Sequence, residues 1–325
     1  MQVHRDIENL PVFRNAVVTI GTFDGVHVGH RQIINKLKVE AIKVNGESVI
    51  ITFHPHPRKV ISSTILGVRL INTLEEKIEV LSGLGIDHLV IVPFTDAFAN
   101  QPAEDYIRNF LFEKFHPDTI IIGYDHRFGR ERLGDYKLME KMAPQLGFKI
   151  KEIPKHILDE IAISSTNIRE AILHNDIEIA NKLLGYTFFF EGKVVDGNKL
   201  GRQLGYPTAN LKVQDAEKLI PGDGIYAVYV NMKKETQLEK EITEVNSFPI
   251  EDIQYKGMMS IGFRPTVDGK KRVIEVNVFD FSKDIYGKTM RVYVKKFLRA
   301  EVKFNTLEDL VKQIDQDKID SLQVL

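Results

Sequence analysis

The chain has 325 residues, of which 43% are hydrophobic and 27% charged, with a formal net charge of -1 and no cysteine. This length favours two domains, and the near-zero charge argues against a protein held to nucleic acid by its overall charge. The absence of cysteine excludes disulfides, thiolate metal sites and thiol catalysis. With neither a signal-peptide core nor a membrane-spanning apolar run, the sequence predicts a soluble cytoplasmic protein without nucleic-acid or membrane partners.

The first half of the chain alternates apolar β-type runs with amphipathic helical segments. Strands are predicted at AVVTI (16–20), SVIITF (48–53), HLVIVPF (88–94), TIIIG (119–123) and FKIKEI (148–153). Helices are predicted at 31–45, 73–83, 102–115, 134–147, 165–174 and 176–184, with Thr73 and Pro102 as helix-start signals. Because the strands lack strict alternation and are separated by helices, we expect a parallel sheet covered on both faces.

From about residue 185 the chain becomes rich in β-type runs. Strands without intervening helices are predicted at TFFFEGKVV (187–195), GIYAVYVNM (224–232), GMMSIGF (257–263), RVIEVNVFDF (272–281) and TMRVYVKKFL (289–298). This pattern predicts a mainly antiparallel barrel or sandwich, followed by a C-terminal helix at 306–316. The polar stretch 232–256 is typical of a long hairpin excursion or loop. We therefore expect two domains, 1–184 and 185–325.

The segment GTFDGVHVGH (21–30) lies where the first strand should pass into a helix. His27 and His30 make a poor metal site, because the sequence shows neither nearby thiolates nor an obvious third ligand. A packing role for the two histidines is a serious alternative. Gly21 and Gly25 permit a tight turn, and Gly29 leaves space beside the new helix. The helix N-terminus offers free N–H groups and a partial positive charge, so the position favours a bound triphosphate.

Three further polar segments fall at the same edge of the expected sheet. They are TFHPHPR (52–58), GYDHRFGRERLGD (123–135) and ISSTNIRE (163–170). Ligands of open parallel sheets bind outside the carboxyl ends of the strands, so one shared site is expected. Ser164, Ser165 and Thr166 are each open to the alternative of a simple helix cap. Arg169, expected in the first turn of a helix, is disfavoured there by the helix dipole unless an anion lies nearby.

Taken together, these four segments resemble the FMN adenylyltransferase module of prokaryotic bifunctional riboflavin kinase/FAD synthetases. The HxGH element alone is shared with a wider nucleotidyltransferase superfamily. The resemblance implies a Rossmann-like α/β domain that joins FMN to the AMP part of ATP and releases pyrophosphate. It implies phosphate-binding catalytic roles for His27, His30 and Arg169, further ATP contacts at Gly21, Phe23, Asp24, Gly29, Ser164 and Thr166, and flavin contacts at His56, Pro57, Asp125 and Phe128. The role of His54 is left open.

The second half carries its own motif, GKVVDGNKLGRQLGYPTANL at 192–211. Its repeated glycines suggest a loop whose backbone approaches a ligand closely. Thr208 and Asn210 offer neutral oxygen atoms, which suit Mg²⁺ carrying a nucleotide. The alternative is an irregular barrel turn with local side-chain caps.

This motif closely resembles the flavokinase signature, and SIGFRPTVDG (260–269) and IEVNVFDFSKDIYG (274–287) extend the match. The resemblance implies an ATP loop at Gly192, Gly197 and Gly201, Mg²⁺ and phosphate contacts at Thr208 and Asn210, a catalytic base at Glu275 and a flavin contact at Arg291. The alternative for Glu275 is a strand-edge acid paired with Arg272 or Arg291. Two features depart from the family: Ser260 stands where asparagine is common, and the 232–256 stretch is long.

The two resemblances imply two reactions, riboflavin + ATP → FMN + ADP and then FMN + ATP → FAD + pyrophosphate. A different HxGH transferase, such as a cytidylyltransferase or pantetheine-phosphate adenylyltransferase, would leave GYPTAN and Glu275 unexplained. A nucleotide-sensing or RNA-binding protein is disfavoured by the near-neutral charge and the lack of base-stacking aromatic motifs. The expected partners are therefore small molecules and Mg²⁺, and homo-oligomerisation is left open.

Overall fold

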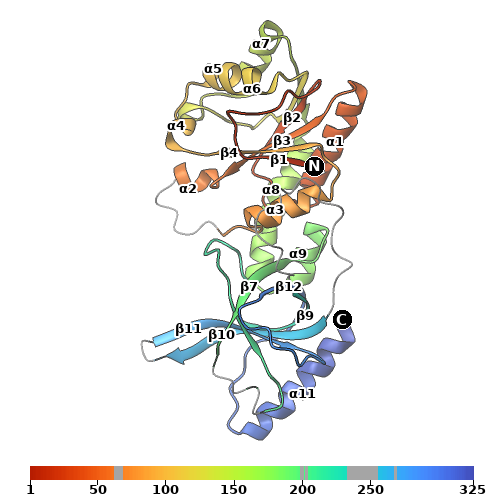
Figure 1. Ribbon diagram of the computed structural model, residues 1–325, viewed down its shortest axis with the longest axis vertical. Coiled ribbons are helices and arrows are strands. Elements are labelled where there is room, and N and C mark those ends of the chain that lie inside the picture. Colours follow the sequence, from red (N-terminus) through yellow and green to blue (C-terminus); the bar gives the residue numbers. More distant parts are fainter. Residues whose placement is uncertain (62–68, 198–200, 202–203, 233–254, 267–268) are drawn as a thin grey trace. The chain divides into compact units, whose positions relative to one another are not determined.

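The computed structural model describes the chain except for residues 62–68, 198–200, 202–203, 233–254 and 267–268 (Figure 1). The described residues form two compact units, one up to Ser165 and the other from Thr166 onward. Nearly all of the predicted excursion at 232–256 lies outside the described residues.

The first unit contains a six-stranded parallel sheet with the strand order β1-β4-β3-β2-β5-β6. Figure 1 labels its strands β1 to β4. The strands are β1 (Gln2–His4), β2 (Val17–Ile20), β3 (Ser48–His54), β4 (His88–Pro93), β5 (Thr119–Gly123) and β6 (Lys149–Ile153). The predicted parallel sheet is confirmed. Strand β1 was not predicted, because its three residues are too few to show a periodicity.

Helices of this unit connect the parallel strands. They are α1 (Val28–Lys43), α2 (Pro57–Ile61), α3 (Leu74–Ser82), α4 (Asp96–Ala99), α5 (Ala103–Asp105), the π-helix η1 (Tyr106–Phe112), α6 (Glu113–Phe115), the 3₁₀-helix η2 (Arg130–Arg132) and α7 (Tyr136–Leu146). The predicted start of α3 is confirmed: the Thr73 side chain accepts from the Glu76 backbone, and the Glu76 carboxylate accepts from the Thr73 backbone.

The core of the first unit explains why the strands are apolar throughout. One hydrophobic cluster joins alternate strand residues, such as Val18 and Val49, to aromatic side chains of η1 and to α7. The intervening strand residues, such as Val17 and Ile50, are also fully buried, and α1 contributes its own buried apolar side chains. Both faces of the sheet are thus shielded from water, which leaves the loops at the strand ends to form a site.

Helix α8 (Lys155–Leu173) begins well before the helix start predicted at residue 165. Pro154 directly follows the last residue of β6. The backbone N–H of Ile157 donates to the carbonyl of Pro154, and the Ile157 side chain is buried. This buried anchor lets the helix start near Pro154, so ISSTNIRE lies inside the helix. The prediction that this segment starts a helix was wrong, and Arg169 is not a first-turn cation. α8 also contains the division between the two units.

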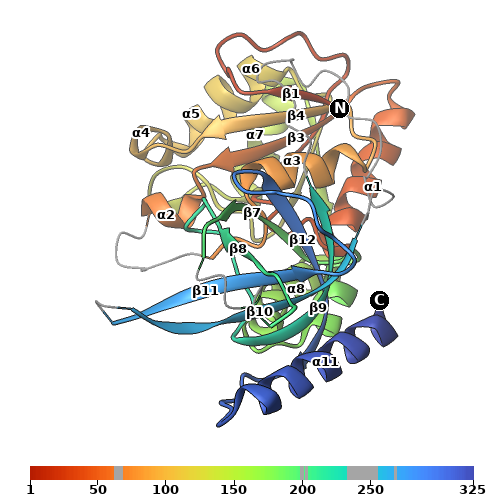
Figure 2. The same cartoon turned by 60° about the horizontal axis from the view of Figure 1, so that its bottom comes forward.

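The second unit contains a closed barrel with the strand order β10-β11-β8-β7-β12-β9 (Figure 2). Its strands are β7 (Phe189–Val195), β8 (Ala209–Lys212), β9 (Gly224–Met232), β10 (Tyr255–Thr266), β11 (Gly269–Val278) and β12 (Thr289–Arg299), and its later helices are α9 (Ile177–Leu184) and α11 (Leu307–Val324). All the strand pairs are antiparallel, as predicted.

Helix α11 continues beyond its predicted end at residue 316. Its N-cap Thr306 accepts from the backbone of Asp309, and its far half is held by the buried carboxylate of Asp317. The Arg299 guanidinium at the end of β12 donates to both oxygens of Asp317, at 2.7 and 2.6 Å. This bidentate ion pair holds α11 beside the barrel (Figure 2).

Candidate active sites

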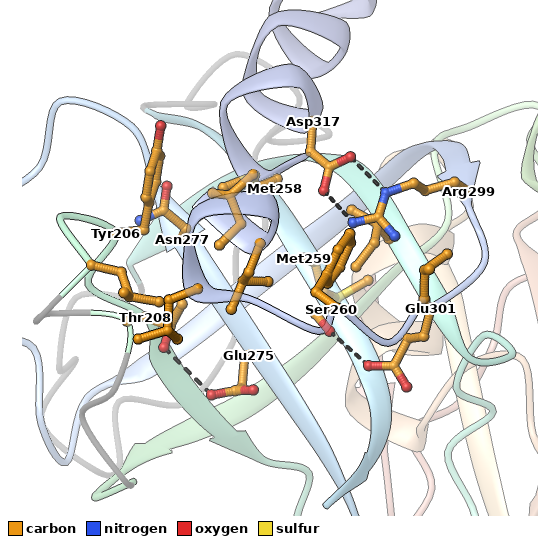
Figure 3. A pocket seen from close by; sticks show the side chains of 18 of the residues that line it. Tyr206, Thr208, Met258, Met259, Ser260, Glu275, Asn277, Arg299, Glu301 and Asp317 are labelled. Atoms are coloured by element: carbon orange, nitrogen blue, oxygen red, sulfur yellow. Dashed lines mark hydrogen bonds and ion pairs between the residues drawn. The ribbon is translucent and has the colours of Figure 1, made fainter. Parts of the chain in front are cut away.

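A cavity of about 510 Å³ lies between the barrel and α11, and we call it the α11 cavity (Figure 3). Its apolar lining includes Met258, Met259, Leu307, Leu310 and Ile314, and its polar lining includes Thr208, Ser260, Arg264, Glu275, Asn277 and Glu301. Glu275 and Asn277 are two residues apart on β11 and line the same cavity, as the alternation of side chains along a strand requires.

A second cavity, of about 590 Å³, lies beside residues 281–286 and is called the loop cavity. Val276 and Val278 line it, so it faces the side of β11 opposite to Glu275. Thr208 lines both cavities. The start of β8 therefore lies where two pockets of ligand size meet.

The strand register brings three polar residues into one row. Asn210 on β8 lies opposite Glu275 on β11, and Glu275 lies opposite Ser260 on β10. Residues directly opposite in antiparallel strands project to the same side of the sheet. The Thr208 hydroxyl also lies 3.5 Å from Glu275 Oε1 (Figure 3). Thr208 and Asn210, predicted from one motif, thus come together with Glu275, predicted from another.

The glycines of the 192–211 motif have different surroundings. A Cβ added at Gly197 would overlap the Asn210 amide, and one at Gly201 would overlap the carbonyl oxygen of Tyr206. Both glycines therefore permit close approach within the turn that precedes β8. Gly192 instead lies inside β7, where a Cβ would be 3.1 Å from the Leu211 side chain.

The turn before β8 is tied to its neighbours on two sides. The Tyr206 hydroxyl donates a short hydrogen bond to Asp315 of α11, and this bond raises the pKa of Tyr206 to about 12. The Asn277 amide donates to the carbonyl of Pro207 at 2.7 Å. These contacts hold the Pro207–Thr208 backbone between β11 and α11.

Glu275 is paired with an arginine that the sequence analysis did not select. Arg264 Nη2 lies 3.2 Å from Glu275 Oε2, whereas Arg272 pairs with Asp223 at 2.7 Å. Arg264 stands four residues along β10 from Ser260, the residue opposite Glu275. The alternative prediction paired Glu275 with Arg272 or Arg291. It named the wrong arginines, because the partner is Arg264.

Arg291 lies on β12 and is almost fully buried. It pairs with Glu191 on the neighbouring β7, and its guanidinium lies 4.5 Å from the centre of the Phe189 ring. Arg291 is not among the described residues that line the α11 cavity or the loop cavity. Its contacts are those of a structural residue, and its flavin contact stays a prediction.

In the first unit, β3, β2 and β5 are neighbours, so the segments that follow them start at one edge of the sheet. His27 is the N-cap of α1, and its ring stacks on that of His30 with 3.8 Å between centroids. His27 Nε2 is 2.8 Å from the hydroxyl of Ser165. Two buried imidazoles thus lie at the N-terminal end of α1, as the phosphate hypothesis requires.

The GTFDG turn is held from behind by a buried pair of charged residues. Asp24 Oδ1 accepts from the backbone N–H groups of Ile71 and Asn72, at 3.0 and 3.3 Å. The Lys77 ammonium donates to the carbonyl of Thr22 at 2.7 Å. Burial lowers the pKa of Lys77, and the charge of Asp24 opposes that shift. Asp24 thus supports the turn, and its contact with ATP stays a prediction.

The aromatic part of the turn packs against the histidines. Phe23 is buried with a φ of 47°, and its ring centroid lies 5.2 Å from that of His30. A Cβ at Gly21 would lie 3.0 Å from the Phe23 ring, so this glycine permits close packing. Gly29 is buried in the first turn of α1.

The residues predicted to bind flavin in this unit differ in their exposure to solvent. Asp125 is exposed just after β5, and Pro57 begins α2. His56 Nδ1 accepts from the backbone of Arg58 at 3.2 Å. Phe128 is buried and stacks on Tyr106 of η1, with 4.6 Å between ring centroids. Burial raises the pKa of Tyr106 above its ordinary value.

The predicted pyrophosphate-binding residues lie along α8. Thr166 is exposed and Arg169 is half-buried, both in the second unit, and the side chain of Ser164 lies outside the described part of the structure. Within the described part of the chain, no group of three or more His, Asp or Glu side chains is placed to hold a metal ion.

Sequence reasoning missed three residues with clear places in these sites. Lys77 lies on the buried side of α3, where a lysine among apolar neighbours was a readable signal. Tyr106 lies in a π-helix, a feature that often marks functional positions but has no sequence signature. Arg264 stands within SIGFRPTVDG, which was matched to the family, but only the side-chain geometry shows its pairing with Glu275.

Two family matches divide the chain in the same order as the two folds. The FAD synthetase family matches residues 10–167, and the riboflavin kinase family matches residues 184–325. The bifunctional riboflavin kinase/FMN adenylyltransferase of Haemophilus influenzae is 34% identical over 318 residues, covering 98% of this chain and 97% of that protein. The enzyme of the same name from Listeria monocytogenes is 35% identical, covering 94% of this chain and 91% of that protein.

A solved structure shares the fold over nearly the whole length. It is described as a macrolide-efflux protein from Streptococcus pneumoniae, with a TM-score of 0.79 and 29% identity, covering 98% of this chain and 97% of that one. None of the helices in the described ranges is long and apolar enough to cross a membrane. From the two matched modules and the full-length relatives, the chain belongs to the bifunctional riboflavin kinase/FMN adenylyltransferase family, which phosphorylates riboflavin to FMN in its C-terminal module and adenylylates FMN to FAD in its N-terminal module.

Proposed function

We propose that riboflavin binds in the α11 cavity, that ATP binds in the loop cavity, and that the phosphoryl group is transferred at Thr208. The observation that carries this proposal is that Thr208 lines both cavities while Glu275 lines only the α11 cavity. The acceptor and the donor of a phosphoryl group must meet in line. The apolar wall formed by Met258, Met259 and Leu310 suits a flat, largely apolar flavin ring.

Glu275 is then the base for the ribityl 5′-hydroxyl. Its Oε1 atom faces Thr208, where the two cavities meet, and its carboxylate can accept the hydroxyl proton as the new O–P bond forms. The γ-phosphoryl group moves from ATP to the flavin, and ADP leaves. Neither Thr208 nor Asn210 forms a covalent intermediate in this scheme.

The same turn fits Mg²⁺. Thr208 and Asn210 supply hard neutral oxygens, and Gly197 leaves the Asn210 amide close to the loop backbone. When bound with ATP, the ion would neutralise phosphate charge. The residues that would hold it here are Thr208 and Asn210, together with the phosphates themselves.

For the second reaction, we propose that His27 and His30 bind the ATP phosphates at the N-terminal end of α1. Their buried imidazoles and the helix N-terminus favour the charge that develops as FMN attacks and pyrophosphate leaves. Ser164, Thr166 and Arg169 are proposed to contact the leaving pyrophosphate, and Phe128 and Asp125 to contact the flavin. The functional modules are proposed to divide between residues 184 and 185, in a cytoplasmic protein that draws on cellular ATP.

Chromatography of the flavins tests this assignment. Purified protein with riboflavin and Mg·ATP should form FMN and then FAD, and chelation of Mg²⁺ by EDTA should stop FMN formation until Mg²⁺ is restored. Asn210→Ala should abolish FMN formation while FAD synthesis from supplied FMN continues. Normal FMN formation by Asn210→Ala would contradict the proposed nucleotide site.

A further inference from the structure

A chain of three charged side chains crosses the polar end of the α11 cavity. Arg264 lies between two carboxylates: its Nη1 is 2.8 Å from Glu301 Oε1, and its Nη2 is 3.2 Å from Glu275 Oε2. All three side chains line the cavity. The other oxygen of Glu275, Oε1, is the one that lies 3.5 Å from the Thr208 hydroxyl.

We propose that Arg264 is a positioning residue for the kinase base, because it binds one oxygen of Glu275 and leaves the other directed toward Thr208. This inference rests on the proposed function, in which Glu275 receives the hydroxyl proton. A carboxylate that is free to rotate would present either oxygen, or neither, to the acceptor. The planar guanidinium holds its donors in a fixed fork, so it can select one orientation.

Glu301 anchors the far side of the fork. A Cβ added at Gly262 would overlap both carboxylate oxygens of Glu301, so the bare backbone of β10 provides the space for this carboxylate. The Ser260 hydroxyl lies 3.5 Å from Glu301 Oε1 (Figure 3). It also lies 3.4 Å from Arg264 Nη2. The residue at the family's common asparagine position thus contacts two members of the chain.

The charges support the same arrangement. Two carboxylates near one cavity would repel each other without a cation between them. Burial works against the charged guanidinium, but the hydrogen bonds and charges of Glu301 and Glu275 outweigh it and raise the pKa of Arg264. The guanidinium is therefore held as a permanent cation, and neither carboxylate can turn away from it without cost.

Steady-state kinetics of FMN formation test the inference in the full-length protein. Arg264→Met should lower kcat by about 10- to 100-fold, the size expected for a misplaced catalytic group, with KM for riboflavin and ATP changed less than about 3-fold. Arg264→Lys keeps the charge without the fork and should recover part of the loss. Gly262→Ala, which displaces Glu301, should lower kcat in the same direction by a smaller factor.

Two comparisons separate positioning from folding. FAD synthesis from supplied FMN should be unchanged in every variant, which shows that the N-terminal unit is folded. Nearly unchanged KM values for riboflavin and ATP show that the barrel is folded. Arg272→Met removes another arginine–carboxylate pair, outside both cavities, and should leave FMN formation unchanged. In a Glu275→Gln background, Arg264→Met should cost less than about 3-fold, because no base is left to position.

The same data contain the outcomes that overturn the inference. A raised KM for ATP with unchanged kcat would mean that Arg264 is a phosphate ligand instead. Losses that add fully in the Glu275→Gln double variant would show that Arg264 acts independently of Glu275. If Glu275→Gln alone has normal turnover, the base assignment itself fails; if only Arg264→Met is normal, the base stands and the positioning role fails.

Discussion

In the N-terminal unit the candidate residues lie in the loops after the strands and on the helices that follow them, whereas in the barrel they lie on the strands or in the turn before β8. β3, β2 and β5 carry no candidate side chain within their buried length, and His27 follows β2 at the start of α1. In the barrel, Asn210, Glu275 and Ser260 are brought together by the pairing of β8, β11 and β10.

The difference follows from what covers each sheet. A parallel sheet shielded on both faces offers a ligand only its edge, and helix N-termini at that edge suit phosphate. An antiparallel barrel leaves alternate side chains free to line a cavity, so a carboxylate such as Glu275 can face a substrate from within a strand. We therefore expect variants of the two sites to separate the two activities.

The largest expected effect is at the barrel. Glu275→Gln keeps the size and polarity of the side chain but cannot accept the proton, so FMN formation should fall by about 10²–10⁴-fold. Flavin fluorescence titration should show nearly unchanged riboflavin affinity, and FAD synthesis from added FMN should continue. Near-normal kinase turnover would make Glu275 a structural residue.

The reciprocal variant is His30→Ala in the N-terminal site. Loss of a donor placed for developing phosphate charge typically costs about 10²–10³-fold, so FAD formation should fall by this factor while FMN formation stays near normal. The measurement is the rate of FAD formation from supplied FMN and Mg·ATP. Equal loss of both activities would indicate a folding role, and activity that depends on zinc would revive the metal hypothesis.

A smaller effect should come from the tie between the GYPTAN turn and α11. Tyr206→Phe removes the hydroxyl that donates to Asp315, and one such hydrogen bond contributes about 0.5–1.5 kcal/mol. Because α11 lines the proposed flavin cavity, KM for riboflavin should rise by about 2- to 10-fold with kcat nearly kept. An unchanged KM would show that this bond has no part in riboflavin binding.

A further effect concerns the pH dependence of stability in the N-terminal unit. Burial, with help from Arg132 and Arg127, lowers the pKa of His126 to about 4, below the ordinary value of 6.5. Between these pH values the unfolded chain binds more protons, so stability falls as pH falls from about 6.5 to 4.

Replacing His126 by phenylalanine should remove this contribution. The stability–pH slope of His126→Phe should be shallower by up to about 1.4 kcal/mol per pH unit, the value for one proton, in urea unfolding between pH 7 and 4.5. Lys296→Met, which removes an exposed ion pair on the barrel, is the control and should keep the original slope. An unchanged slope in His126→Phe would mean that His126 does not titrate differently on folding.

The sequence predicted features that depend on local chemistry. The helix-start signal at Thr73 is local, and the start predicted from it is confirmed. Strand alternation on β11 placed Glu275 and Asn277 on one side, and both line the α11 cavity. The predicted start of the helix at ISSTNIRE failed because Ile157 anchors α8 earlier, and burial of one side chain cannot be read from a cap signal.

By itself the sequence determined the two folds, their order and the motifs that carry the chemistry, because turn residues, periodicity and helix-start signals act over a few neighbouring residues. The pairing of Glu275 with Arg264, and with neither Arg272 nor Arg291, became visible only in the folded barrel. In the folded chain, Thr208 also lies at the meeting of two cavities and Lys77 supports the GTFDG turn. These contacts depend on strand register and on packing between segments far apart in the chain, and no local pattern specifies which of several arginines or lysines will arrive there.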